Sequence, residues 1–135
     1  MEAPPTERDV EELLKKARLE LDRGISALID AQMAAELLLD KRVLQLLEGR
    51  VGLEELERAA RLYLVASKLA QLFKSAIGEW LSIEQVCGEG GSAECIAEAL
   101  RARMLEIQSN ASLTAIPEIL DAYREALKRL HLNES

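Results

Sequence analysis

Two cysteines are the residues of this sequence best suited to covalent chemistry. Cys87 and Cys95 flank the glycine-rich stretch 88–91. If Cys87 ends one helix and Cys95 lies in the first turn of the next, antiparallel packing brings their Cα atoms near the ~5.5 Å that a disulfide requires. A structural disulfide is the first interpretation. Two reduced, semi-buried thiols are one alternative, and a redox switch with Cys95 activated at a helix N-terminus is the other.

The single histidine, His131, lies near the end of the chain, seven positions after Arg124. This spacing loosely resembles the Arg-x4-to-6-His element of the HEPN nucleases, which are small helical bundles that cut RNA as dimers. The resemblance implies catalysis by Arg124 and His131. The simpler interpretation, which we adopt, is a solvated histidine at a helix C-terminus, where the helix dipole favours positive charge.

Two acidic pairs raise the possibility of a metal site. Glu54 and Glu57 form an ExxE pair, and Glu118 and Asp121 form an ExxD pair. These pairs are similar to the metal-binding pairs of all-helical nucleotide pyrophosphohydrolases, and the similarity implies metal-dependent hydrolysis. Acids in a helix first turn are also expected from the dipole alone. The two cysteines lack a neighbouring histidine and supply half of the ligands of a zinc site. We therefore predict no metal and no cofactor.

Composition and charge restrict the partners. The chain has 17 basic and 24 acidic residues among 135, a formal charge of -7, and the basic residues are interleaved with acids. Nucleic-acid binding needs a basic surface, so it is disfavoured for this chain alone. No window has the ~18 apolar residues of a membrane span, and the N-terminus lacks a secretory pattern. These features predict a cytoplasmic protein without a membrane partner. Abundant Glu, Arg and Leu with little Asn and Gln suggest a thermophilic source.

The hydrophobic pattern predicts an all-α fold in a single domain over residues 1–135. Apolar residues recur at helical spacing, and glycine or Asn/Ser clusters interrupt them. We expect an antiparallel bundle of about four helices, built on a long, coiled-coil-like hairpin of the first two. The expected segments are a disordered lead-in at 1–5 and helices at 6–48, 53–86, 92–108 and 114–131.

The helix expected over residues 6–48 is the element on which the rest must pack. Its apolar stripe runs without a proline from Val10 to Leu38 in steps of four and three. Gly24 lies on this stripe, and glycine is a common place for a kink. We predict a continuous, bent helix, although a break at Gly24 is the alternative.

Two segments near the tip of the expected hairpin are apolar on nearly every side. A helix of this kind must be covered on every side, and two short helices cover only part of a long hairpin. A second copy of the chain, or another helical protein, is therefore expected at the tip. The predicted interface residues are Leu37, Leu39, Val43, Leu44, Leu47, Leu62, Leu64 and Val65.

The sequence thus favours a non-enzymatic interaction or scaffold subunit that acts through helix–helix association and forms a homodimer. A helical-bundle nuclease or nucleotide hydrolase, using the Arg/His pair or the paired carboxylates, is the alternative.

Overall fold

The structure is a computed structural model that describes residues 5–19, 26–74, 86–87, 92–109 and 117–134. These ranges contain five helices: α1 (Glu7–Leu19), α2 (Ser26–Leu47), α3 (Leu53–Lys74), α4 (Ser92–Ser109) and α5 (Pro117–Glu134). The predicted all-α class is confirmed. None of the helices in the described ranges is both long enough and apolar enough to cross a bilayer.

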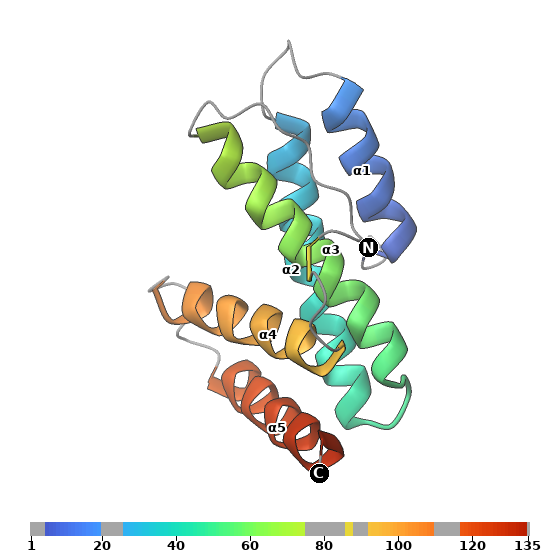
Figure 1. Ribbon diagram of the computed structural model, residues 1–135, viewed down its shortest axis with the longest axis vertical. Helices are drawn as coiled ribbons and strands as arrows, with labels where there is room; N and C mark the ends of the chain where they lie inside the picture. Colours follow the sequence, from blue (N-terminus) through green and yellow to red (C-terminus); the bar gives the residue numbers. More distant parts are fainter. Residues whose placement is uncertain (1–4, 20–25, 75–85, 88–91, 110–116, 135) are drawn as a thin grey trace.

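The stretch predicted as one helix over residues 6–48 forms two helices, α1 and α2, that lie side by side (Figure 1). Arg42, near the end of α2, donates two hydrogen bonds of 2.8 Å to Glu7 at the start of α1, so the helices run antiparallel. The apolar stripe continues through both helices because both bury it in one core, and the period alone does not reveal the reversal. Gly24 and the rest of 20–25 lie outside the described residues.

Local signals set the ends of several helices. The Thr6 hydroxyl accepts from the Asp9 N–H at 3.3 Å, and the Asp9 carboxylate accepts from the Thr6 N–H at 2.9 Å, which is a reciprocal cap of α1. Gly49 ends α2 with a φ of 75°. There the N–H of Gly49 reaches the Leu46 carbonyl and the N–H of Arg50 reaches the Gln45 carbonyl, a Schellman pattern that turns the chain back into α3.

The core lies mainly between α1, α2 and α3 and extends to α4 and α5. Leu28, Ala35, Leu38 and Ala60 are among the core residues and are at most 2 % exposed. Alanines are numerous in the core, which lets the helix backbones approach closely.

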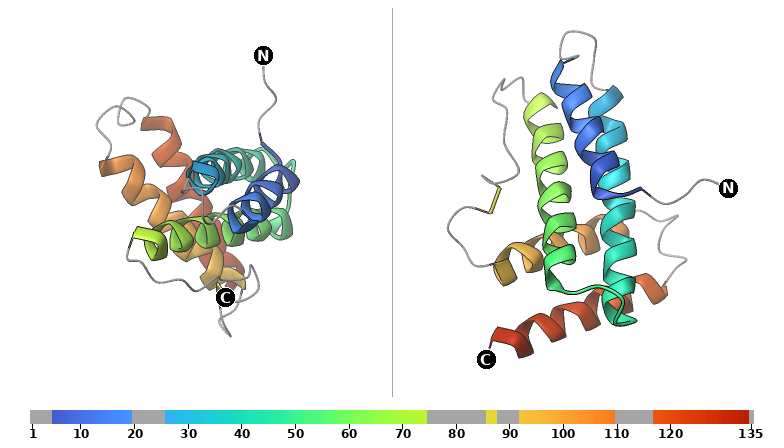
Figure 2. Two further views of the ribbon diagram at one scale, coloured as in Figure 1. Left: turned by 90° about the horizontal axis from the view of Figure 1, so that it is seen from above. Right: turned by 90° about the vertical axis from the view of Figure 1, so that its right-hand side faces the viewer.

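Helices α4 and α5 lie crosswise to α2 and α3, as the views in Figures 1 and 2 agree. Helix α4 contacts α3 and α5, and α5 also contacts α2. The Arg129 guanidinium of α5 donates to the Leu46 carbonyl at 3.3 Å and so satisfies part of the C-terminal end of α2. The helix predicted over 53–86 is described as α3 up to Lys74, and residues 75–85 lie outside the described part.

Candidate functional site

A partly buried ion cluster joins α2, α4 and α5, and the sequence interpretation did not identify it. Its centre is Arg103 of α4, which is only 6 % exposed and is the sole charged residue among the buried residues that the structure describes. The other members, which we group with it as the Arg103 cluster, are Glu36 and Asp40 of α2, Glu106 of α4 and Tyr123 of α5.

Asp40 is the best-satisfied acid of the cluster. Arg103 donates Nε to one Asp40 oxygen at 3.1 Å and Nη2 to the other at 2.9 Å, which is the two-pronged geometry that makes arginine–carboxylate pairs strong and directional. The Tyr123 hydroxyl donates a third hydrogen bond to Asp40. Three helices are therefore tied together at one carboxylate.

Glu36 and Glu106 share the remaining side of the guanidinium. Arg103 Nη1 lies 3.4 Å from a Glu36 oxygen and 3.8 Å from a Glu106 oxygen. Burial, a hydrogen bond with Glu36 and the negative charges of Glu36 and Asp40 together raise the pKa of Glu106 from 4.5 to about 8. Glu106 therefore carries its proton at neutral pH.

Arg103 and Tyr123 both keep the proton that their side chains ordinarily carry at neutral pH. Burial lowers the pKa of Arg103, but its hydrogen bond with Asp40 and the charges around it raise that pKa by more, so the guanidinium stays protonated. Burial, and then the charge and hydrogen bond of Asp40, raise the pKa of Tyr123 well above its usual value, against the opposing effect of Arg103. The phenol therefore remains a hydrogen-bond donor.

One signal in the sequence could have revealed the cluster. On α4 the buried stripe passes through Ile96, Leu100 and Ile107, and Arg103 stands where the same spacing calls for an apolar residue. An arginine on a buried stripe needs an acidic partner. The partners lie on other helices, 63 positions away for Asp40, so the sequence does not show which acids they are.

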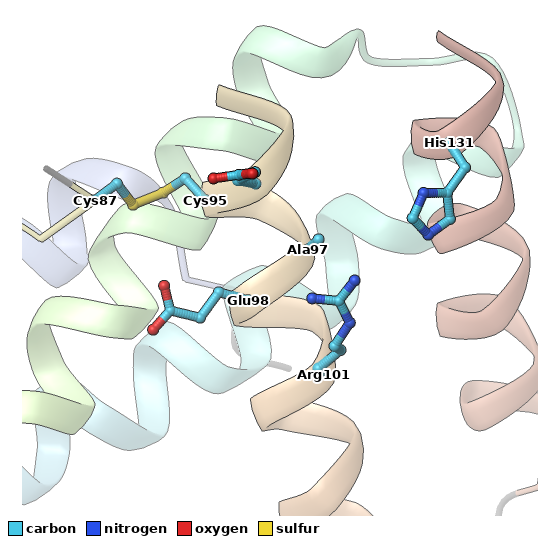
Figure 3. A pocket seen from close by; sticks show the side chains of 7 residues that line it. Cys87, Cys95, Ala97, Glu98, Arg101 and His131 are labelled. Atoms are coloured by element: carbon cyan, nitrogen blue, oxygen red, sulfur yellow. A yellow bond between two sulfur atoms is a disulfide. The ribbon is translucent and has the colours of Figure 1, made fainter. Parts of the chain in front are cut away.

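The structure joins Cys87 and Cys95 by a disulfide with Cα atoms 5.4 Å apart, which confirms that they lie within bridging distance. They border a cavity of about 340 Å³ that is also lined by Glu94, Ala97, Glu98, Arg101 and His131. Figure 3 shows the disulfide at one end of this group and His131 of α5 at the other, with Arg101 of α4 between them. The cavity lining therefore mixes both charge signs.

The structure does not gather the predicted catalytic pair in this cavity. His131 lines it, whereas Arg124 does not and instead pairs with Asp121 at 3.0 Å, one turn earlier on α5. Along a helix, seven residues correspond to about 10 Å. Arg124 and His131 are thus two turns apart.

The four acids of the proposed metal pairs lie on two helices. Glu54 and Glu57 are in the first turns of α3, and Glu57 pairs with Arg61 at 2.9 Å. Glu118 and Asp121 are in the first turns of α5. Among the described residues, no three His, Cys, Asp or Glu side chains are arranged to hold a metal ion. The carboxylates of the Arg103 cluster surround a guanidinium instead.

Most of the predicted interface lies inside the chain. Five of its eight residues are at most 3 % exposed: Leu39, Val43, Leu62, Leu64 and Val65. Leu47 is partly buried against the same core. These segments are apolar on every side because α2 and α3 are each covered from several directions by other helices of the chain, including α1, which the prediction had joined end to end with α2.

Leu37 and Leu44 remain exposed, at 54 % and 43 %. Ile29 and Met33, at 44 % and 57 %, lie on the same helix. Steps of four, four and seven residues keep all four side chains on one side of α2. We call these four residues the α2 row.

Comparisons with known proteins found no matching family model, no matching curated protein and no matching solved structure.

Proposed function

We propose that this protein is a non-enzymatic interaction or scaffold subunit that associates with a second copy of itself through the α2 row. The observation that carries the proposal is the exposure of four large apolar side chains along one side of one helix. Single exposed apolar residues are ordinary on protein surfaces, whereas several large ones on one side of one helix favour an interface.

The size of the row suits a helix-on-helix contact. From Ile29 to Leu44 it extends about 22 Å at 1.5 Å per residue. Around the helix the row lies nearly opposite Ala31 and Leu38 of the core. It borders Glu36 and Asp40, which face α4 and α5, so a partner helix on the row would lie beside those two helices.

A second copy of the chain is the simplest partner for this row, because the same row then forms both sides of the contact. In an antiparallel pairing with its two-fold axis near Leu37, Ile29 of one copy faces Leu44 of the other, and the same contact occurs twice. Of the eight interface residues expected from the sequence, this pairing keeps Leu37 and Leu44, and it adds Ile29 and Met33.

An enzymatic role has less support from the geometry. A catalytic site brings its groups together around a space where substrate can lie. Arg124 does not share the cavity that His131 lines, and the two acidic pairs are on different helices.

The proposal is tested by the molecular mass in solution. Sedimentation equilibrium between about 1 and 200 μM should show wild-type protein moving from the 15.0 kDa monomer toward twice that mass. The double variant Met33→Glu, Leu37→Glu should stay monomeric, because each copy would place buried charge in the contact. Leu105→Glu is the matched control, since Leu105 is 64 % exposed on α4, outside the row. A wild-type monomer over the whole range overturns the proposal, as does equal association by the double variant.

A further inference from the structure

The Arg103 cluster contains more acid than base. Three carboxylates, those of Glu36, Asp40 and Glu106, approach one guanidinium within 3.8 Å. If all were ionised, the cluster would carry two uncompensated negative charges around a side chain that is only 7 % exposed. Unpaired charge in such surroundings is strongly disfavoured, and a carboxyl group responds by retaining its proton.

The geometry shows which acids share the excess charge. Both oxygens of Asp40 accept from Arg103, and Tyr123 donates a further hydrogen bond to one of them. Glu36 and Glu106 hold only the longer contacts to the guanidinium, at 3.4 Å and 3.8 Å from the same nitrogen, Nη1, so both carboxyl groups lie beside one donor. Two carboxyl groups can share a hydrogen bond only when one of them is protonated.

We propose that the Arg103 cluster is a proton-binding site, in which Glu36 and Glu106 share one proton in the folded protein and its loss weakens the packing of α4 and α5 against α2. The groups that face this proton are Glu36 and Asp40 from α2, Arg103 from α4 and, through Asp40, Tyr123 from α5. The inference does not rest on the self-association proposed above, although Glu36 and Asp40 lie beside Leu37 on α2.

The sign of the pH dependence follows from the raised pKa of Glu106. In the unfolded chain this carboxyl has its ordinary value of 4.5, and in the folded protein the value is about 8. Its contribution to stability is complete below 4.5 and is lost as the pH rises through 8. Between these values the folded state binds one more proton than the unfolded state, so the unfolding constant should rise about tenfold per pH unit.

The test is urea unfolding of the full chain between pH 6 and 9, followed by circular dichroism. Wild-type protein should lose stability across this window. Glu106→Gln keeps a hydrogen-bond donor toward Glu36 but cannot ionise, so its stability should be nearly constant and should exceed that of wild type at pH 9. Glu36→Gln should also flatten the profile, because it removes the neighbouring charge. Glu11→Gln, an exposed acid of α1, should keep the wild-type slope.

A second measurement addresses the proton directly and needs no variant. Carbon-13 NMR of the side-chain carboxyl groups in wild-type protein should show one glutamate with a titration midpoint near 8. The proposal is overturned if every glutamate titrates below about pH 6. It is also overturned if Glu106→Gln retains the wild-type slope between pH 6 and 9.

Discussion

The packing of α1 against α2 differs from the packing of α4 and α5 against α2 in the kind of side chain that is buried. Between α1 and α2 the buried residues are aliphatic, including Val10, Leu14 and Ala17, and the ion pair of Glu7 and Arg42 stands at the edge. Where α4 and α5 meet α2, an arginine and a tyrosine bond to one aspartate among the aliphatic contacts.

The difference shows how one helix can hold neighbours in two ways. Apolar burial has no direction, so between α1 and α2 the directional contact is the two-pronged Arg42–Glu7 pair at the edge of the aliphatic core. A two-pronged arginine–carboxylate pair has a fixed geometry, so it specifies how α4 crosses α2. The polar contact is also easier to destroy, because removing one partner leaves the other charged and buried.

The largest expected loss of stability comes from a change in the Arg103 cluster. Arg103→Ala should destabilise the protein by about 3–5 kcal/mol, because it leaves Asp40 and the two glutamates without their cation. Urea unfolding at pH 7 measures the loss. Arg103→Lys should recover little, since an ammonium cannot make the two parallel hydrogen bonds.

Leu38→Ala is the matched change in the apolar core, where Leu38 is fully buried. It should cost about 2–5 kcal/mol, but that cost should not vary with pH. The comparison fails if Arg103→Ala costs less than about 1 kcal/mol, or if the pH profiles of the two variants coincide.

The next effect concerns the disulfide that ties residue 87 to the start of α4. By the chain-entropy relation, closing a loop of about nine residues contributes roughly 2.6 kcal/mol. Reduction should therefore lower the urea midpoint and speed amide hydrogen exchange in α4 more than in α1 and α2. The double variant Cys87→Ala, Cys95→Ala should not respond to reductant. An unchanged midpoint for reduced wild-type protein would show that the bridge adds no stability.

The smallest effect is expected at the edge of α1. The side chains of Arg42 and Glu7 are 13 % and 24 % exposed, and Glu7→Gln should cost about 1 kcal/mol in thermal or urea unfolding. Arg8→Gln, which breaks a pair that is 86 % and 62 % exposed, should cost less than about 0.5 kcal/mol. Equal costs for the two changes would contradict the assigned role of Glu7 in fixing α1 to α2.

Local chemistry made part of the fold predictable. The cap at Thr6, the C-terminal glycine at Gly49 and the start of α4 near Ser92 each depend on residues within one turn of the position they define. The pairing of Cys87 with Cys95 was accessible for the same reason, because the two cysteines are only eight positions apart in the sequence.

The rest of the fold and the candidate site depend on contacts between residues far apart in the sequence, which the local pattern does not predict. A break at Gly24 was only the alternative prediction, and the reversal of α2 against α1 was not predicted, because both helices present the same stripe to the same core. The Arg103 cluster was missed because its members lie on three different helices. Within each helix their spacing is the same as that of other polar residues. Only the folded arrangement distinguishes Asp40 from the exposed acids around it.

The hydrogen bond between Tyr123 and Asp40, which spans 83 positions of the chain, also bears on how the protein is made. A ribosome adds about 5–20 residues per second, so Asp40 is synthesised roughly 4–17 seconds before its tyrosine partner. During that interval α1, α2 and most of α3 can assemble by aliphatic contacts, while the Asp40 carboxylate stays hydrated. Attachment of α4 and α5 is then the step that removes most of this carboxylate from water, and it follows the assembly of the first three helices.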